Sequence, residues 1–419
     1  MQMTQESSSR KVKPTVLDIF CGAGGMSLGF KNAGCQILGG IDQNRYAIDT
    51  HHQNFPTATL KLPPQDIRGL RNLDQLGLNP GEVDILVGGP PCQVFSRVGI
   101  GKMRKLGRDI ESDHRNFLYK EFVRFVAYYK PLCFVMENVD NLANKEDTLS
   151  KIYKDFSSNR RKEYPGYNVD YRVLDASEFG VPQKRRRLFI IGVRYDLEVD
   201  PPFPTKRVKR PISVGEAIYD LPNLEPFVMP LKTKSSGPKQ RDAECPYKCL
   251  PQSLYQERMR KRKKEGEGVW NHLCRSHNDK DIMIFERLDQ GGKYRDIPEE
   301  MMRYRVDIFD DKYKRLIWNE PAWTLTAHMR KDGLAYIHPL QHRSISVREA
   351  ARIQSFPDDF VFYAPMTRMF ELVGNSVPPL LAEAVAKPLV KLIQSYRKEQ
   401  KSADFTRFEG TLNGELRSP

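Results

Sequence analysis

The sequence has no apolar run long enough to cross a bilayer, and its polar beginning, MQMTQESSSRKVK, has no signal-peptide core. It has seven cysteines, an odd number scattered over 419 residues, which argues against a disulfide framework and for free thiols in a reducing compartment. The sequence has fewer acidic than basic residues, with 53 Asp and Glu and 67 Lys and Arg, so its formal net charge is +14. We therefore expect a soluble intracellular protein with a polyanionic partner, nucleic acid before others.

Between residues 15 and 194, short β-branched runs alternate with amphipathic stretches. Five runs are typical of buried strands: VLDIF, CQILGGID, VDILVGG, LCFVMENV and RLFIIGV. The stretches 26–33, 44–55 and 116–129 are candidate helices between them. Strands separated by such helices predict βαβ units, and hence an α/β, doubly wound, Rossmann-like fold with a mostly parallel sheet.

This alternation stops after about residue 195. Residues 199–343 are rich in Pro, Lys and Arg, and the densest basic run, RMRKRKK, occupies 258–264. Helical patterns return at 346–356 and 378–396. The predicted division is a mobile tail, an α/β domain, a smaller inserted domain, C-terminal helices that complete the α/β domain, and a polar tail: 1–14, 15–198, 199–343, 344–397 and 398–419.

A glycine-rich turn follows the first candidate strand, where VLDIF runs into CGAGGMSLGF. Glycines at such a turn let the backbone approach a ligand, although the spacing is not the dinucleotide GxGxxG signature and a purely structural turn is the alternative. Asp42 ends the next strand, at the distance where a carboxylate meets ribose hydroxyls, and Asp66 follows a third candidate strand. Each acid alone could be a helix cap or a surface charge, but their order favours a nucleoside ligand.

Two chemically notable residues follow the next strands. Cys92 comes directly after a buried strand and a Gly-Gly-Pro-Pro turn, at the edge where parallel sheets bind ligands. As a thiolate it would be a nucleophile; the alternative is one more buried cysteine, like Cys133. Glu137 ends the apolar run LCFVM, and a half-buried carboxyl there can have a raised pKa and donate a proton near neutrality. A carboxylate that simply faces water is the alternative.

The run QKRRR precedes the last apolar strand. Alternation places Gln183, Arg185 and Arg187 on one face, and Lys184 and Arg186 on the other. One basic face could then meet a base carbonyl and phosphate. A charged sheet edge that discourages aggregation is the alternative.

Six segments in this order resemble the motifs of the DNA (cytosine-5) methyltransferase family, in its compact bacterial restriction-modification form: DIFCGAGGMSLGF, GGPPCQVFS, FVMENV, QKRRR, REAARIQSFPDDF and VGNSVPPLLAEAVA. The resemblance covers nearly the whole chain. It implies a class I S-adenosylmethionine-dependent fold, S-adenosyl-L-methionine as cofactor with S-adenosyl-L-homocysteine as product, and double-stranded DNA with a specific cytosine-containing site. The compact build resembles that of bacterial enzymes that accompany restriction endonucleases, which implies a cytoplasmic, nucleoid-associated protein with no membrane partner and a functional pairing with such an endonuclease. We expect a monomer, because one duplex site flips one base per visit.

The resemblance also implies residue roles. Phe20, Asp42 and Asp66 would hold the adenosine of the cofactor, while Gly22 and Gly24 would line its methionine. The expected cofactor contacts are Asp18, Phe20, Gly22, Gly24, Gly25, Asp42, Asp66, Ile67, Pro90, Asn375, Ser376 and Val377.

For catalysis, the resemblance implies that Cys92 attacks carbon 6 of the target cytosine while Glu137 engages ring nitrogen 3. Arg187, with Arg185 close by, would contact the cytosine and anchor the surroundings of Cys92. Carbon 5 then takes the methyl group and loses its proton, and the thiolate is eliminated. Because neither ring atom is reachable inside a duplex, the base must flip out.

Residues 199–343 fall where the family has its target-recognition domain, and the expected DNA contacts are Gln93, Ser96, Arg97 and Thr324. The glycine-containing segment 96–116 suits a loop that closes over the flipped base, or an ordinary surface loop. We expect the basic run 258–264 to be a solvated helix face near phosphates. No metal site is predicted, because the spacing of the group Cys245, Cys249, His272, Cys274 and His277 fits no common zinc finger.

Three other functions are possible. A transfer-RNA cytosine-5 methyltransferase would share the fold, but its usual Cys-Phe-Thr signature is absent from this sequence. An inert DNA-binding relative is disfavoured by the presence of Cys92, Glu137 and Arg187. A Rossmann oxidoreductase is disfavoured by the missing GxGxxG.

Overall fold

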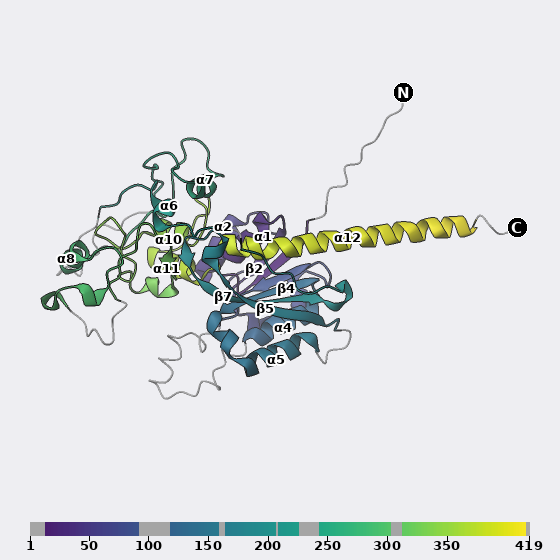
Figure 1. Ribbon diagram of the computed structural model, residues 1–419. Coiled ribbons are helices and arrows are strands. Elements are labelled where there is room, and N and C mark those ends of the chain that lie inside the picture. The colour runs from purple at the N-terminus through teal and green to yellow at the C-terminus, as the bar shows by residue number, and fades with distance from the viewer. Residues whose placement is uncertain are drawn as a thin grey trace, which may run out of the picture.

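A six-stranded sheet forms the centre of the computed structural model, which describes residues 13–91, 118–158, 164–206, 208–225, 243–302 and 312–415, with side chains up to residue 400 (Figure 1). The strand order is β2-β1-β3-β4-β7-β5. The strands are β1 (Thr15–Ile19), β2 (Gln36–Ile41), β3 (Ile85–Gly88), β4 (Cys133–Val139), β5 (Tyr167–Asp175) and β7 (Arg186–Arg194).

Only one strand of this sheet runs against the others. β1 pairs in parallel with β2 and β3, and β3 with β4, whereas β7 is antiparallel to both β4 and β5. The predicted mostly parallel, doubly wound sheet is therefore confirmed. β5 was not predicted, because most of its residues are only partly buried and its sequence, YNVDYRVLD, interrupts the apolar pattern with charged and polar residues.

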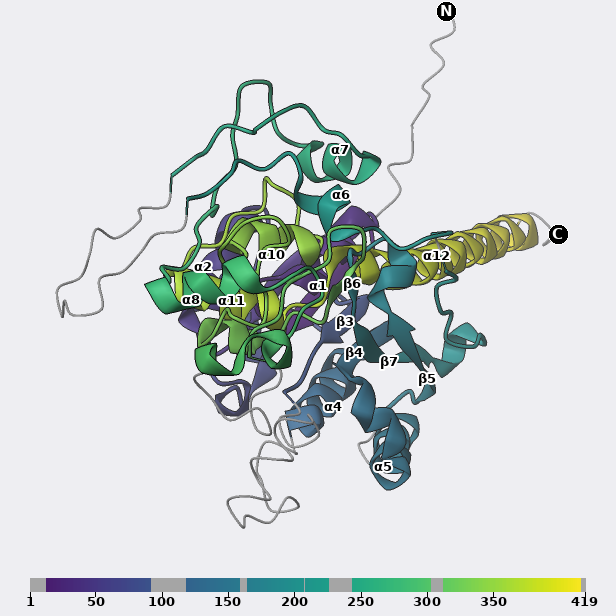
Figure 2. The ribbon, with the colours of Figure 1, turned by 60° about the vertical axis from the view of Figure 1, so that its left-hand side comes forward.

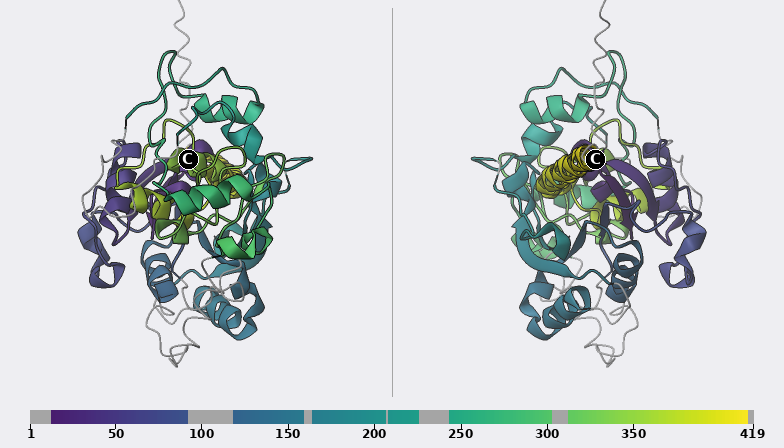
Figure 3. Two further views of the ribbon diagram at one scale, coloured as in Figure 1. Left: turned by 90° about the vertical axis from the view of Figure 1, so that its left-hand side faces the viewer. Right: turned by 90° about the vertical axis from the view of Figure 1, so that its right-hand side faces the viewer.

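Helices cover both faces of the sheet (Figures 1 and 3). On one face α1 (Gly25–Asn32) packs against the long C-terminal α12 (Pro379–Glu415), so closely that a Cβ on Gly29 would lie 2.4 Å from the Cβ of Ala382. On the other face lie α4 (Leu118–Tyr129) and α5 (Glu146–Ser157). Alternate strand residues enter two separate cores, since Val16 and Ile85 belong to the first and Leu17 and Leu86 to the second.

Most of a second lobe follows β7 in the chain, and the C-terminal segment leads back from it to the first lobe (Figure 2). It contains the two-stranded sheet of β6 (Gln183–Lys184), which precedes β7, and β8 (Ala322–Trp323). Its helices are α6 (Val214–Ile218), α7 (Leu254–Arg260), α8 (Asp279–Arg287), α10 (Val347–Ile353) and α11 (Met366–Asn375), whereas α2 (Arg45–Asn54) belongs to the first lobe. Around α8 there is a small core of its own, built on Ile284, Phe285 and Tyr313.

The rest of the second lobe shares the first core. Val214 of α6 and Met259 of α7 belong to the same apolar cluster as α10, α11 and α12. The predicted division at 199–343 therefore stays a prediction, because only part of that range has a separate core. Within the described ranges, no helix combines the length and apolar character needed to cross a membrane.

Candidate active site

The carboxyl edge of β4 carries an ion pair between two partly buried side chains. Glu137 is near the end of β4, and Arg187 is at the start of the antiparallel neighbour β7, two residues from the residue paired with Glu137. Residues in this diagonal relation point to the same face of a sheet. Arg187 Nε lies 3.1 Å from Glu137 Oε1, and the two side chains are 15% and 13% exposed.

Burial raises the pKa of Glu137 above its usual value of 4.5, and the guanidinium groups of Arg187 and Arg185 oppose that rise. The carboxyl group can therefore hold a proton at higher pH than a solvent-exposed glutamate. Gly89 at the end of β3 leaves room for it, since a Cβ there would lie 3.0 Å from Glu137 Oε2. A partly exposed acid of this kind can donate a proton to a ring nitrogen that enters the site.

The turn that leads to Cys92 is held beside this carboxyl group. Asn138, the residue after Glu137, donates from Nδ2 to the carbonyl oxygen of Pro90 at 3.4 Å. Asn138 was not predicted as a site residue, although its place between Glu137 and Val139 in FVMENV was a usable signal. Cys92 and the expected DNA contacts Gln93, Ser96 and Arg97 lie outside the described residues, as does the segment 96–116.

The glycine-rich loop after β1 has the backbone geometry of a ligand cradle. Phe20 has a φ of 61°, in the left-handed region that is rare for a bulky side chain. Gly22 donates its N–H to Asp42 Oδ2 at 3.0 Å, so the ends of the parallel strands β1 and β2 meet there. A Cβ on Gly22 would have no heavy atom within 4 Å, which means that open space adjoins the loop. These residues fit an adenosyl cofactor.

The other loop glycines serve packing. A Cβ on Gly24 would lie 2.6 Å from the ring of Phe55, and one on Gly25 would lie 2.3 Å from the carbonyl oxygen of Val377. Gly24 and Gly25 are therefore small because neighbouring residues approach them, and not because they adjoin the open space beside Gly22. Val377 and the buried Ser376 are brought to the loop by the C-terminal segment, while Asn375 is exposed.

Asp42 has a buried carboxylate that already accepts two backbone N–H groups, from Gly22 at 3.0 Å and from Asn44 at 2.8 Å. Burial raises the pKa of Asp42, and the backbone N–H groups of Asn44, Gly22 and Gln43 oppose the rise. Because a carboxylate has about four acceptor sites, three such donors leave capacity for a hydroxyl donor. The placement is therefore compatible with ribose hydroxyls as further partners.

Asp18 lies one layer behind the loop. Its Oδ2 accepts from both the N–H and the hydroxyl of Ser27, at 3.1 and 2.6 Å, and the same hydroxyl is 3.1 Å from His51 Nε2. Burial raises the pKa of Asp18 to about 7 and lowers the pKa of His51 to about 3. The arrangement fixes the first turn of α1, so Asp18 supports the loop through Ser27.

Asp66 and Ile67 have different surroundings from those expected. In the described residues 56–66 no strand precedes Asp66, because Leu60 forms only an isolated bridge with Gly39. Asp66 begins a short 3-10 helix, accepts from the N–H of Arg68 and forms an ion pair with its guanidinium at 2.5 Å. Ile67 is buried in the second core.

Arg185 is fully buried and its guanidinium is occupied by carbonyl groups. It donates to the backbone oxygens of Leu325 at 2.7 Å, Ser376 at 3.1 Å and Gly374 at 3.2 Å. Its Nε has no hydrogen-bond partner among the described residues. These bonds fit a positioning task for Arg185, and its expected place among the catalytic residues stays a prediction.

Gln183, on the same face as Arg185, is also fully buried, whereas Lys184 and Arg186 are exposed, as the alternation predicted. Gln183 Nε2 donates to Gln354 Oε1 at 2.5 Å, and Gln354 was not predicted as a functional residue. Thr324, directly after β8, is partly buried, and its hydroxyl donates to the carbonyl oxygen of Lys184 at 2.8 Å, so it joins this stretch to β6.

Four side chains of the basic run 258–264 form ion pairs with carboxylates of the same chain. Its three arginines each pair with a carboxylate: Arg258 with Glu383 at 2.7 Å, Arg260 with Asp220 at 3.2 Å and Arg262 with Asp359 at 3.5 Å. Lys263 pairs with Glu244 and Glu267. Arg258 and Arg262 are exposed, as a solvated face requires, whereas Arg260 and Lys263 are partly buried. The position of the run near phosphates stays a prediction.

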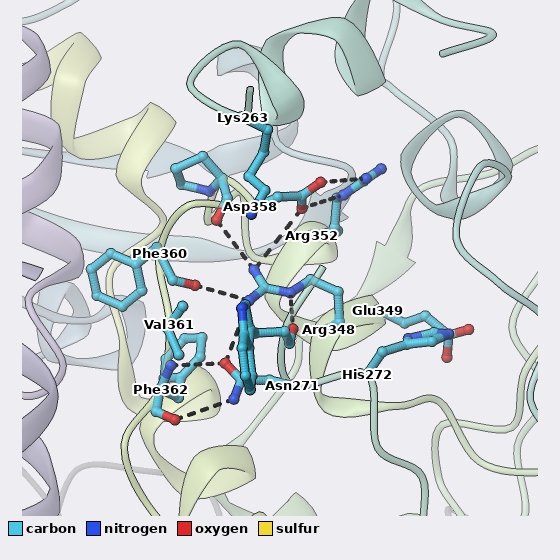
Figure 4. A network of polar contacts seen from close by, with 12 residues as sticks. Lys263, Asn271, His272, Arg348, Glu349, Arg352, Asp358, Phe360, Val361 and Phe362 are labelled. Atoms are coloured by element: carbon cyan, nitrogen blue, oxygen red, sulfur yellow. Dashed lines mark hydrogen bonds and ion pairs between the residues drawn. The ribbon is translucent and has the colours of Figure 1, made fainter. Parts of the chain in front are cut away.

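Two further arginines, both from α10, belong to a buried network that ties α10 to other segments of the second lobe (Figure 4). Arg352 donates to Asp220 and Asp358, each at 2.7 Å. Arg348 donates to the carbonyl oxygens of Trp270 and Phe360 at 2.8 and 2.9 Å. The segment REAARIQSFPDDF thus fixes α6, the stretch around Trp270 and the chain before α11 to one another.

The two histidines of the group considered as zinc ligands have hydrogen-bond partners within the protein. His272 contacts the carbonyl oxygen of Pro222 and the hydroxyl of Ser346, and His277 contacts Ser344. The described ranges contain no group of three or more His, Cys, Asp or Glu side chains that could hold a metal ion.

The chain is similar to known DNA methyltransferases in both sequence and structure. The family described as C-5 cytosine-specific DNA methylase matches residues 14–391. The chain is 35% identical to the type II methyltransferase M1.HphI of Haemophilus parahaemolyticus, over 90% of this chain and 87% of that protein. It is 33% identical to the type II methyltransferase M.DdeI of Desulfomicrobium norvegicum, over 89% and 87%. A solved E. coli structure, described as a putative DNA modification methyltransferase encoded within a prophage, superposes with a TM-score of 0.70 and 26% identity, over 91% and 99% of the two chains.

Proposed function

Because the chain belongs to the family of C-5 cytosine-specific DNA methylases, whose activity is DNA cytosine-5 methylation, we propose that Cys92, Glu137 and Arg187 carry out this reaction on one cytosine of a specific duplex site. The observation that supports the proposal most directly is the Glu137–Arg187 pair at 3.1 Å, beside the Pro90 turn that leads to Cys92. Transfer-RNA methylation and an inert binding role are not favoured by the family match.

In the proposed reaction the thiolate of Cys92 adds to carbon 6 of the flipped cytosine. The pKa of Glu137 is raised by burial, so its carboxyl group can donate a proton to ring nitrogen 3 as electron density moves from carbon 6 into the ring. Carbon 5 becomes nucleophilic as an enamine carbon. After methyl transfer, carbon 5 loses its proton, the Cys92 thiolate is eliminated, and nitrogen 3 returns its proton to Glu137.

Arg187 has two tasks in this proposal. It holds Glu137 in one orientation through the 3.1 Å contact, and it presents positive charge to the carbonyl of the bound base. Both tasks require the guanidinium to stay at the edge of the sheet. The pairing of Val139 with Arg187 in the β4–β7 ladder keeps it there.

Methyltransferases of this fold use S-adenosylmethionine, which supplies an electrophilic methyl group when it is bound. We assign its adenosine to Phe20 and Asp42 and its methionine to the loop at Gly22, where the open space lies. Ser376 and Val377 of the C-terminal segment lie against Gly25 beside this loop, and Asn375 is a further proposed contact. Asp18, Gly24 and Gly25 support the pocket, and Asp66, Ile67 and Pro90 stay proposed contacts at its rim.

The substrate is DNA, and the two relatives named type II methyltransferases support a role in a restriction-modification pair. We propose that the methylated site is protected from a partner endonuclease. Thr324, Gln93, Ser96 and Arg97 are the proposed DNA contacts, and a monomer in a nucleoid-associated, cytoplasmic setting is part of the proposal. DNA from cells that express the protein should resist endonucleases that cut at the mapped site.

The first experiment is transfer of labelled methyl groups from S-adenosylmethionine to unmethylated duplex DNA, with transfer RNA as a parallel substrate. Wild type should yield 5-methylcytosine in DNA, and Cys92→Ala should yield none while still binding DNA. Sequencing of the methylated DNA then maps the site. Label in transfer RNA alone, or full activity of Cys92→Ala, would contradict the proposal.

A further inference from the structure

A relay of three hydrogen bonds crosses the interior between the two lobes. The N–H of Leu325 donates to Gln183 Oε1 at 2.8 Å. Gln183 Nε2 then donates to Gln354 Oε1 at 2.5 Å, and Gln354 Nε2 donates to the carbonyl oxygen of Ser376 at 2.5 Å. Both glutamine side chains have no exposed surface. Donors and acceptors therefore alternate along the relay, which begins at the backbone N–H of Leu325 in the second lobe and ends at the carbonyl oxygen of Ser376 beside the cofactor loop.

Arg185 runs beside the relay and joins the same two segments. It donates to the carbonyl oxygen of Leu325 at 2.7 Å and to that of Ser376 at 3.1 Å. Both backbone polar groups of Leu325 are thus bound by buried side chains of the QKRRR segment. Because an orphaned buried donor or acceptor costs more than its hydrogen bond contributes, Leu325 and Ser376 are constrained to move together.

One end of the relay lies in the region proposed to bind DNA. Leu325 lies two residues after β8 and precedes the 3-10 helix Ala327–Arg330, and β8 pairs in parallel with β6. Gly374 packs tightly on this stretch, since a Cβ there would lie 2.3 Å from the carbonyl carbon of Thr326. A displacement of β8 by bound DNA therefore acts on Gly374 and Ser376 at once.

The other end lies against the cofactor loop. Ser376 is followed by Val377, whose carbonyl oxygen would be 2.3 Å from a Cβ on Gly25. Gly25 is the first residue of α1 and comes directly after the loop that contains Gly22. No side chain separates the two backbones at this contact, so the position of Ser376 sets the position of the loop.

From this geometry we propose that Gln183 and Gln354 are positioning residues that couple DNA binding at β8 to cofactor binding at the Gly22 loop. The inference rests on the proposed function, because it assumes DNA at the second lobe and cofactor at the loop. Coupling of this kind is reciprocal: DNA tightens the binding of the cofactor by the same factor by which the cofactor tightens the binding of DNA. The two glutamines touch neither ligand, and they act through Leu325 and Ser376.

The test measures the Kd of S-adenosylhomocysteine by calorimetry, with and without a saturating duplex that carries the mapped site. The ratio of the two values should be about fivefold or more in wild type, within the usual range of coupling between sites. In Gln183→Leu and Gln354→Leu the ratio should fall to about one. The double variant should lose no more than either single one, because the bonds act in series.

Gln256→Leu is the matched control. Gln256 is as buried as Gln354, but its amide bonds the carbonyl of Glu216 and the N–H of Gln252 and reaches neither end of the relay. It should keep the wild-type ratio even where its stability falls. Gln354→Asn, which shortens the amide by one methylene, gives a milder variant should the leucine variants fail to fold.

Three outcomes would overturn the coupling role. They are a wild-type ratio of one, a wild-type ratio retained by a folded Gln354 variant, and an equal loss of the ratio in Gln256→Leu. Methyl transfer by wild type separates this failure from that of the proposed function. An enzyme that methylates DNA but shows no coupling refutes the relay alone, whereas an enzyme that methylates no DNA refutes the function on which it rests.

Discussion

Replacing Arg187 with leucine leaves the carboxyl group of Glu137 without the guanidinium that now lies 3.1 Å away. Removing one partner of a fully buried ion pair costs about 3–5 kcal/mol. Here the side chains keep 15% and 13% exposure, and the carboxyl group can escape the cost by binding a proton, so we expect a loss of about 1–3 kcal/mol at pH 8. Methyl transfer should fall by about two orders of magnitude, because the acid is no longer held in place.

The stability loss should depend on pH in a defined direction. Burial already raises the pKa of Glu137 above its usual 4.5 in the folded protein, and Arg187 opposes that rise. Without Arg187 the pKa of the folded state rises further, so the folded variant retains a proton over a wider range than the unfolded chain. The stability that this proton contributes is fully present below about pH 4.5 and is lost as pH rises through the raised pKa. The variant should therefore match wild type most closely at pH 5 and least at pH 8.

Urea unfolding at pH 5 and pH 8 measures this difference. The matched control is Glu137→Gln/Arg187→Leu, in which the buried group cannot ionise, and its stability relative to wild type should vary little between the two pH values. Two results would refute the account of Glu137 as a buried, titrating acid with Arg187 as its counter-ion. One is a loss of stability in Arg187→Leu that is equal at both pH values. The other is the same pH-dependent loss in the double variant that also carries Glu137→Gln.

Three further variants test other parts of the structure. Gly22→Val should weaken S-adenosylhomocysteine binding at least about tenfold, measured by calorimetry, because its side chain enters the open space beside the loop and disfavours a φ of 53°; unchanged affinity would remove Gly22 from the pocket. Asp18→Asn should remove a pH dependence of up to about 4 kcal/mol, because the pKa rise from 3.8 to about 7 makes the wild type lose stability between pH 4 and pH 8; urea unfolding that shows the same pH dependence in both proteins would contradict this. Arg258→Met should leave the slope of DNA affinity against salt unchanged in filter binding, because Arg258 pairs with Glu383; a slope that is smaller by about one would show a phosphate contact.

The strands of the sheet could be predicted from the sequence where complete burial produces a continuous run of apolar residues. The strands of VLDIF, VDILVGG and LCFVMENV are buried on both faces, so they are continuous apolar runs, and all three were found. β5 is the outermost strand beside β7 and is only partly buried, so its apolar pattern is weak. The antiparallel direction of β7 also has no local signature, because it depends on where the chain returns to the sheet.

The sequence indicated which residues belong to the site better than it indicated what each of them does there. The family resemblance assigned Glu137 and Arg187 to the same cytosine site, and the structure brings them into contact. Asp18 was expected at the cofactor, yet it lies behind the loop and bonds Ser27. Gln354 was missed because its task depends on Gln183, which is 171 residues away in the chain. Contacts of such separation are set by tertiary packing, which periodicity and spacing do not encode.

The QKRRR segment shows how one alternating pattern can contain three different tasks. Gln183, Arg185 and Arg187 point to the same side, and on the sequence alone they form one basic face. Burial separates them, because the first two have almost no exposed surface and are bound by Gln354 and by backbone carbonyls, whereas Arg187 stays at the rim beside Glu137. The buried guanidinium of Arg185 donates to three backbone carbonyl oxygens, whereas the side chain of Arg187 keeps 15% exposure beside Glu137. We therefore expect substitutions at Arg185 and Arg187 to fail in different assays, the first in ligand coupling and the second in methyl transfer.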